Sequence, residues 1–324
     1  MVAGRTAGHV VIDGLAWESF VVAMLGGAIR SGTPVAYAAI GETIAERAGI
    51  INLGLEGMML VGAMTAVALR IGTGSWVLGL FGAMAVATVL ALLHAYLVVV
   101  RGANQIVSGL ALTLLGMGLS GFLGRPFVGV RFDGLASLRG PSGRGSSDWL
   151  SILGGQDGLA LAAMFVAIAG WFLLQRTRFG LAVRAVGEDP AAAYAQGISV
   201  VRTRIVAVGI GGALAGLGGA HLSLAYTHLW AEKMTAGQGW IAVGLVIVAR
   251  WNPIWALVAA YGFGALAILH LQLQASGVTA SPYLLAMFPY VAAITALTVT
   301  TVLLAGRGHA IPAALAKDLQ LFKR

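Results

Sequence analysis

Residues 76–100 read WVLGLFGAMAVATVLALLHAYLVVV, a run that contains no Asp, Glu, Lys or Arg. A helix needs about 20 apolar residues to cross the hydrocarbon core of a bilayer, and this run is long enough. Its apolar residues are continuous and do not alternate with polar ones, which excludes a strand of a membrane β-barrel. The run therefore predicts a transmembrane helix.

The composition of the whole chain agrees with this prediction. Of 324 residues, 59% are hydrophobic and 10% are charged, and the mean hydropathy is +0.89. A soluble domain carries about 25% charged residues, because its surface must be solvated. The 47 glycines lie largely within apolar runs, where they allow helices to approach closely or to kink. We therefore predict one all-α, polytopic membrane domain.

Further apolar segments follow at lengths that suit membrane helices. We expect them near residues 17–45, 50–69, 76–100, 104–124, 158–175, 203–226, 239–249, 253–273 and 283–305. Segment 239–249 is too short to cross alone at about 1.5 Å per residue, so we expect a half-helix paired with the next segment across Trp251-Asn252-Pro253. The stretch from Arg30 to Pro34 is expected to interrupt the first segment. The chain then has about eight to ten crossings, including broken helices.

Basic residues suggest how the chain is oriented. Many lie in the segment 176–204 and in the tail 306–324, and placing both in the cytoplasm follows the positive-inside rule. The membrane domain then covers residues 17–305, with a Gly/Ser-rich loop near 125–157 on the outer side. Residues 1–16 lack the features of a cleaved signal peptide.

Several kinds of chemistry are absent from the sequence. With no cysteine, thiolate metal sites and cysteine nucleophiles are excluded. No Gly-Lys pair, G-x-S-x-G or H-E-x-x-H motif is present, so we expect no catalytic residue, no metal and no cofactor bound by this chain. His221 and His228 are better explained by packing than by metal binding. The net charge of +8 is not concentrated in a dense basic run, so nucleic acid is not an expected partner.

Residues 41–57, GETIAERAGIINLGLEG, place charges beside apolar sequence. Glu42 and Glu46 are four residues apart and would share one face of a helix, and Asn52 and Glu56 repeat that spacing. Charged groups at membrane depth usually face a cavity or a partner. These residues either line a transport pathway or, for Glu42, Glu46 and Arg47, lie at the membrane interface.

A second polar cluster lies in residues 103–116, ANQIVSGLALTLLG. Asn104 and Ser108 are four residues apart, with Gln105 beside them. Uncharged amides suit reversible hydrogen bonding to a neutral polar solute. The alternative is that these side chains cap a helix or bond between helices.

A third feature is the cytoplasmic segment RTRFGLAVRAVGEDPAAAYAQGISVVRTR, residues 176–204. Glu188, Asp189 and Pro190 suit the first turn of a short helix that Gly197 would end. Such a helix is either a rigid lever for a partner protein or part of an interfacial loop. Since the chain lacks a nucleotide-binding motif, ATP-driven transport would require another chain to bind ATP.

Together these stretches resemble the permease subunits of bacterial nucleoside and simple-sugar ABC importers, within the branched-chain amino acid and ribose permease superfamily. The resemblance rests on residues 41–60, 104–112 and 176–198, on Gly237 to Val243, and on Asn252-Pro253, and it runs in order from about 30 to 305. It implies a type II ABC importer permease in the bacterial cell membrane.

The resemblance also implies partners and roles. The partners are a second permease, often a different one, ABC ATPase subunits that bind ATP and Mg, and an extracytoplasmic solute-binding lipoprotein. The implied solute contacts are Asn52, Glu56, Asn104, Gln105 and Ser108. The implied ATPase coupling residues are Arg184, Gly187, Glu188, Asp189, Pro190, Ala191 and Gly197.

Three functional hypotheses follow. The first is an ATP-driven importer of nucleosides or related nucleobase compounds, for which Trp240, Tyr226 or Phe122 would supply a stacking surface. The second is an importer of a simple sugar such as ribose. The third is a proton-coupled secondary transporter that uses Glu56 or Glu42. A membrane-embedded enzyme is not supported, because no nucleophile–base or metal constellation is present.

Overall fold

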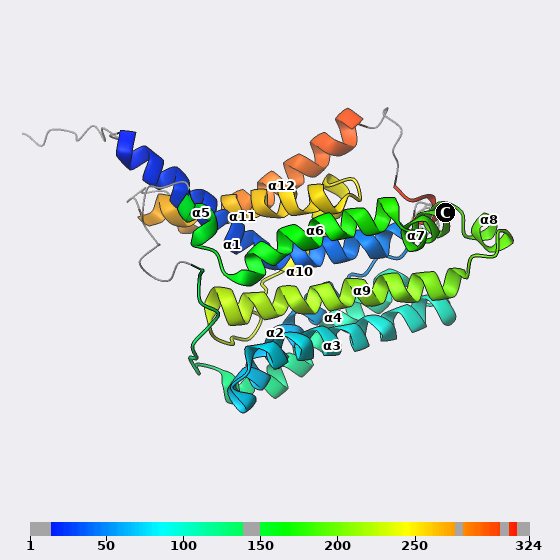
Figure 1. Cartoon of the computed structure of the whole chain (residues 1–324), viewed down its shortest axis with the longest axis horizontal. Coiled ribbons are helices and arrows are strands. Elements are labelled where there is room, and N and C mark those ends of the chain that lie inside the picture. The colour runs from blue at the N-terminus through cyan, green and yellow to red at the C-terminus, as the bar shows by residue number, and fades with distance from the viewer. Residues whose placement is uncertain (1–13, 139–149, 276–280, 305–310, 316–324) are drawn as a thin grey trace, which may run out of the picture.

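The computed structural model describes residues 14–138, 150–275, 281–304 and 311–315. Over these residues the chain is helical apart from short connections, and no strand longer than an isolated bridge occurs. The long helices run side by side along one direction (Figure 1). Helices α7 and α8 lie at one end of the bundle, and α5 and the start of α1 lie at the other (Figure 1). The expected all-α architecture is confirmed.

The helices follow one another without long insertions in the described ranges. In chain order they are α1 (Gly14–Arg47), α2 (Leu55–Thr73), α3 (Trp76–Ala95), η1 (Tyr96–Val100), α4 (Gln105–Gly124), η2 (Arg125–Phe127), α5 (Leu150–Gly154), α6 (Gly158–Arg176), α7 (Arg178–Glu188), α8 (Pro190–Ala195), α9 (Val200–His221), η4 (Leu222–Thr227), α10 (Gln238–Val248), α11 (Pro253–Ala275) and α12 (Pro282–Leu304).

Helix α1 is continuous, so the expected interruption between Arg30 and Pro34 is wrong. Proline removes one main-chain hydrogen bond and crowds the preceding turn. Close packing on two sides holds the helix together there. A side chain at Gly32 would collide with the main chain of α11, and one at Gly218 on α9 would lie 2.5 Å from the carbonyl oxygen of Pro34. The neighbouring Thr33 hydroxyl also donates to the carbonyl of Ile29 at 2.6 Å.

The interior of the bundle is formed by α1, α2 and α9. In the most apolar stretches of α2 and α9, 67% and 72% of residues are buried, against 28% in α6 and 17% in α11. The glycines of α9 allow this burial, because their missing side chains let neighbouring backbones approach. Gly212 and Gly216 face α3, where added side chains would meet Ala91, Ala87 and Ala83.

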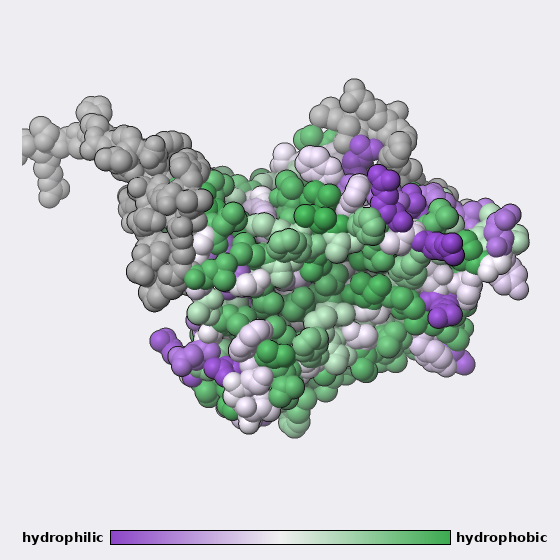
Figure 2. All heavy atoms as spheres, in the orientation of Figure 1, coloured by the Kyte–Doolittle hydropathy of each residue, from purple (hydrophilic) through white to green (hydrophobic). Residues whose placement is uncertain are grey.

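The outer surface of the bundle suits a bilayer. Among the described residues, six helices are long and apolar enough to cross a membrane: α2, α3 with η1, α4 with η2, α6, α9 with η4, and α11. Large apolar side chains such as Phe81, Leu114 and Phe165 are exposed on them. Figure 2 shows a broad hydrophobic surface, with hydrophilic residues gathered near the end that carries α7 and α8 and at the opposite end. The chain is therefore a multi-pass membrane protein.

Two interruptions lie inside this bundle. Residues 48–54 separate α1 from α2 without forming a helix. Helix α10 has 11 residues and is joined to α11 by a sharp turn, in which Arg250 and Trp251 both have φ of 54°. The expected half-helix followed by a break at residues 251–253 is therefore confirmed. The expected N-terminal segment 1–16, the loop near 125–157 and the C-terminal tail 306–324 fall partly in the ranges 1–13, 139–149, 305–310 and 316–324, which lie outside the described residues.

Candidate functional site

The non-helical segment 48–54 brings the first two polar clusters together. The main-chain N–H of Ile51 donates to Gln105 Oε1 at 2.9 Å, and its carbonyl lies 3.1 Å from His94 Nε2. Since a carbonyl only accepts, Nε2 carries a proton. The other ring nitrogen of His94 lies 3.0 Å from the hydroxyl of Ser108. Two stretches separated by about 50 positions thus meet in one hydrogen-bonded network.

Further polar groups of this segment also have hydrogen-bond partners. The N–H of Asn52 donates to Glu42 Oε1 at 2.7 Å, and the Asn52 side chain accepts from the N–H of Gly54 at 3.0 Å. The carbonyl of Leu53 accepts from the Thr113 hydroxyl at 2.8 Å and from Trp240 Nε1 at 3.3 Å. Irregular backbone inside a membrane protein requires such partners, because no water is available in hydrocarbon. The polar residues here stabilise an unwound segment.

Glu56 binds the start of the half-helix α10. Its Oε1 accepts from the Thr235 hydroxyl at 2.5 Å and from the N–H of Gly237 at 2.8 Å, while its Oε2 accepts from the N–H of Gly239 at 2.8 Å. The first N–H groups of a helix lack partners within the helix and carry partial positive charge. The capping residue Gly237 has no side chain that could accept from these N–H groups, so the Glu56 carboxylate on α2 accepts from them instead.

The other end of α10 is bound by the end of α1. Trp251 Nε1 donates to Glu46 Oε2 at 2.5 Å. Arg47 donates to the carbonyl of Trp251 at 3.0 Å and to that of Arg250 at 3.3 Å. These bonds hold the two consecutive residues with positive φ, a conformation that costs energy for side chains of this size. Residues 46–56 therefore fix both ends of α10.

Residues 176–204, which were expected to form a cytoplasmic lever, contain two helices, α7 and α8, before the start of α9. Asp189 caps α8 by accepting from the N–H groups of Ala191 and Ala192 at 2.9 and 3.1 Å, and Pro190 is its first residue. Gly197, with φ of 81°, follows the end of the helix. The predicted start at Asp189 and Pro190 and the predicted end near Gly197 are confirmed, whereas Glu188, which was expected near the first turn, is the last residue of α7.

Contacts of α7 connect it to the end of α1. Gly187 packs directly on the carbonyl of Arg47, where any side chain would collide. Arg184 donates to Gln175 Oε1 at 3.3 Å, and Glu188 interacts electrostatically with Arg47. A displacement of α7 and α8 would therefore act on the same residue that holds the turn after α10.

The five predicted solute contacts differ in their surroundings. Asn52, Glu56, Gln105 and Ser108 are buried and lie in or beside the network around segment 48–54. Asn104 is exposed and caps α4, accepting from the N–H groups of Ile106 and Val107. Their contact with solute stays a prediction. Each has a helix-capping or packing role in this conformation.

From the sequence alone we inferred no functional role for four residues of this network: His94, Thr113, Thr235 and Trp251. Each binds a residue that is distant along the chain, so spacing alone did not indicate them. Trp251 had the strongest signal, since it stands beside Asn252-Pro253 at the expected break.

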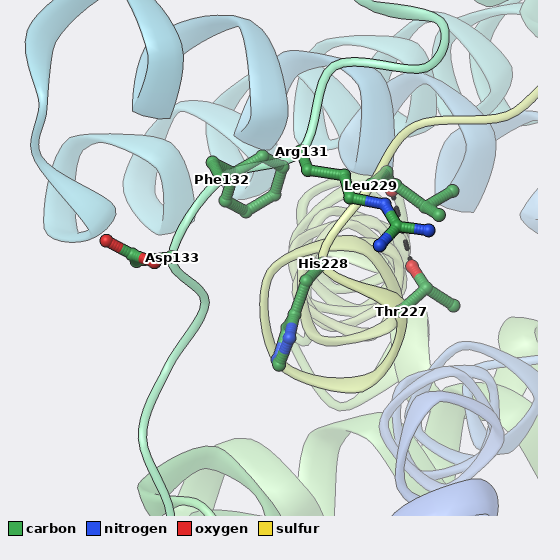
Figure 3. Close-up of a pocket in the computed structure, with 6 residues that line it drawn as sticks. All are labelled: Arg131, Phe132, Asp133, Thr227, His228 and Leu229. Carbon is green, nitrogen blue, oxygen red and sulfur yellow. Dashed lines mark hydrogen bonds between the residues drawn. The ribbon is translucent and has the colours of Figure 1, made fainter.

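A separate polar pocket of about 500 Å³ lies at the end of the bundle opposite α7 and α8. Its lining residues are Arg131, Phe132, Asp133, Thr227, His228 and Leu229. Figure 3 shows the Arg131 guanidinium beside Thr227 and Leu229, with Asp133 pointing away. His221 is not part of it and pairs with Asp157 at 3.2 Å. Among the described residues no group of three potential metal ligands occurs.

Comparison of the sequence with known proteins identifies its family. Residues 23–297 match the family model described as the permease component of branched-chain amino acid transport systems. A putative glucose ABC transporter permease of Haloferax volcanii is 38% identical, over 94% of this chain and 99% of that protein. No solved structure matches significantly.

Two further relatives carry nucleoside names. The guanosine ABC transporter permease NupQ of Bacillus subtilis is 34% identical, and the nucleoside permease NupC of Lactococcus lactis is 35% identical, each over 82% of this chain and 88% of the relative. Each of the three organisms also has a second matching permease, 23–24% identical to this chain. The chain belongs to the family of permease components of branched-chain amino acid transport systems and is an ABC transporter permease.

Proposed function

We propose that this chain is one of two different permease subunits of an ATP-driven importer for nucleosides or related nucleobase compounds. The observation that carries the proposal is the half-helix α10, held at both ends inside the bundle. Many transporters bind their solutes near the membrane midplane, at sites formed by discontinuous helices. The names of the guanosine and nucleoside permeases support the choice of solute.

Trp240 supports a nucleobase in particular. It lies on α10, is 44% exposed, and its indole N–H donates to Leu53 in the unwound segment. Its ring therefore offers an aromatic surface beside the segment that holds Asn52 and Gln105. Stacking of a base on an aromatic ring contributes about 1–3 kcal/mol. Of the three aromatic residues considered from sequence, Trp240 is the one with a hydrogen bond to this segment.

The energy source is assigned to partner chains. In this proposal ABC ATPase subunits bind ATP and Mg and dock on α7 and α8, which face the cytoplasm with the C-terminal tail. The exposed position of Tyr194 on α8 and the capped, rigid start of that helix support a docking role. Motion of α8 passes through Gly187 and Arg47 to the turn after α10, and this changes the side from which the solute path is open.

Two further partners complete the assembly. The second, more distant permease in each of the three organisms supports a heterodimer in which this chain pairs with a different permease. The end that carries the Arg131 pocket then faces outward, toward a solute-binding lipoprotein. The membrane domain of residues 17–305 is thus one half of the translocation unit.

A sugar is the second candidate solute, because the relative from Haloferax volcanii is described as a putative glucose permease. A competition experiment separates the two. Vesicles that contain the complete transporter take up labelled guanosine, and unlabelled nucleosides compete while glucose and ribose do not. Trp240→Ala lowers guanosine uptake at limiting guanosine about 5- to 150-fold, as the stacking free energy of about 1–3 kcal/mol implies. Competition by glucose, with uptake unaffected by Trp240→Ala, would favour the sugar.

A further inference from the structure

Two acidic side chains on α1 are buried with too few hydrogen-bond donors. Glu42 is 0% exposed and Glu46 is 2% exposed, and they are one helical turn apart. Each has one bonded oxygen: Glu42 Oε1 accepts from Asn52, and Glu46 Oε2 accepts from Trp251. The other two oxygens, Glu42 Oε2 and Glu46 Oε1, are buried and have no hydrogen-bond partner. Two acceptors therefore lie on one face of the helix without a donor.

Among the residues that the structure describes, no cationic side chain forms an ion pair with Glu42 or Glu46. The charged and titratable groups on the helices packed against α1 include Arg176 on α6, Arg178, Arg184 and Glu188 on α7, Arg202, Arg204 and His221 on α9, and Tyr261 and His270 on α11. Arg47 ends α1 itself, Arg250 lies in the turn after α10, and His94 bonds to segment 48–54. Arg47 and Arg204 donate to main-chain carbonyls, and His94 bonds to Ile51 and Ser108. No ion pair from any of these groups to Glu42 or Glu46 occurs within the described ranges. Two neighbouring carboxylates that are both ionised would repel each other strongly in such surroundings.

We propose that Glu42 and Glu46 form a binding site for one proton, which they share. A proton taken from solvent on either free oxygen creates an O–H that donates to the free oxygen of the other glutamate. One proton then gives both unpartnered atoms a hydrogen bond and lowers the charge of the pair from −2 to −1. No other bond is formed or broken.

The shared proton links two functional segments. Glu42 holds Asn52 in the unwound segment, and Glu46 holds Trp251 in the turn after α10. The hydrogen bond between the carboxyl groups therefore joins these segments across one turn of α1. Loss of the proton leaves two like charges one helical turn apart, and their repulsion weakens both attachments.

The difference in bound protons between the folded and unfolded chains determines how folding stability changes with pH. At neutral pH the folded chain holds one more proton than the unfolded chain, in which both glutamates are solvated and ionised. Stability therefore falls as pH rises, by up to a factor of 10 in the folding equilibrium constant for each pH unit. A chain with a single carboxylate at this site does not show this dependence.

Infrared spectroscopy of the full chain in bilayers tests the proposal without reference to transport. At neutral pH the wild-type protein shows a carboxylic C=O band that shifts on deuteration, and both Glu42→Gln and Glu46→Gln remove it. Glutamine is a suitable replacement because its amide donates to the remaining carboxylate and keeps the charge at −1. Glu56→Gln is the matched control and leaves the band unchanged, because the equally buried Glu56 accepts from three donors and both of its oxygens already have a hydrogen-bond partner.

A measurement on the wild-type chain covers the case in which a variant does not fold. The band and the resistance to unfolding decline over the same range of rising pH. Glu42→Gln or Glu46→Gln, whichever folds, keeps its stability over that range. A wild-type spectrum without the band at neutral pH, or a band that persists in the folded Gln variants, would overturn the proposal.

Discussion

Removal of the Glu56 carboxylate should release the start of α10. Glu56→Ala leaves the N–H groups of Gly237 and Gly239 without their acceptors, while the Thr235 hydroxyl is free to turn elsewhere. A buried donor without a partner costs about 1–3 kcal/mol, so the two N–H groups together cost about 2–6 kcal/mol of unfolding free energy. Glu56→Gln retains one acceptor oxygen and should lose about half as much.

The comparison variant is Asn104→Ala. Asn104 also caps a helix, but it is exposed, and loss of such a cap costs about 1 kcal/mol. Unfolding of the purified chain by SDS in mixed micelles gives the difference in free energy between the two variants. Hydrogen exchange then locates the effect, and Glu56→Ala should speed exchange in residues 237–241 without affecting α6.

The result for Glu56 can contradict this reasoning in two ways. A loss of stability no larger than that of Asn104→Ala would mean that the carboxylate does not hold α10. Unchanged exchange at the start of α10, despite a large loss of stability, would mean that Glu56 acts elsewhere in the bundle.

The remaining predictions concern packing and coupling. Gly116→Ala should lower the unfolding free energy by about 1–3 kcal/mol, because the added carbon would lie 2.5 Å from the backbone of α2. Gly118→Ala on the same helix meets no atom within 4 Å, so it should be neutral or stabilising in the same SDS titration. Gly187→Ala should push α7 away from α1 and uncouple ATP hydrolysis from uptake in vesicles, and unchanged coupling would refute the contact with α1. Replacing Asp189 and Pro190 with Ala and Gly should remove the cap of α8, at about 1 kcal/mol, and weaken binding of the ATPase subunits in a pull-down while membrane insertion is normal. Full ATPase binding by that variant would reject α8 as the docking helix.

Local features of the sequence predicted several elements of the fold. The cap of α8 is formed by Asp189 and Pro190, which act on residues directly after them, so the helix start was evident from the sequence. The half-helix α10 was predicted for a similar reason, since its apolar run is short and Pro253 follows it. Long apolar runs predicted the membrane helices, because their length is set by the bilayer.

Features that depend on distant contacts were not predictable in this way. Glu56 accepts from residues about 180 positions away, so its role as a cap for α10 has no local signature. The polarity of residues 42–56 was evident, but not that these residues hold both ends of one half-helix. Pro34 suggested a break in α1, but close packing at Gly32 of α1 against α11 and at Gly218 of α9 outweighs the lost hydrogen bond.

The central claim is that this chain forms the solute path while partner subunits supply the energy. Uptake of labelled guanosine by vesicles, with and without the ATPase subunits and ATP, tests this claim most directly. We expect uptake with this chain, its partner permease, the ATPase subunits and ATP together, and none when ATP or the ATPase subunits are omitted. Uptake by this chain alone, driven by a proton gradient, would contradict it.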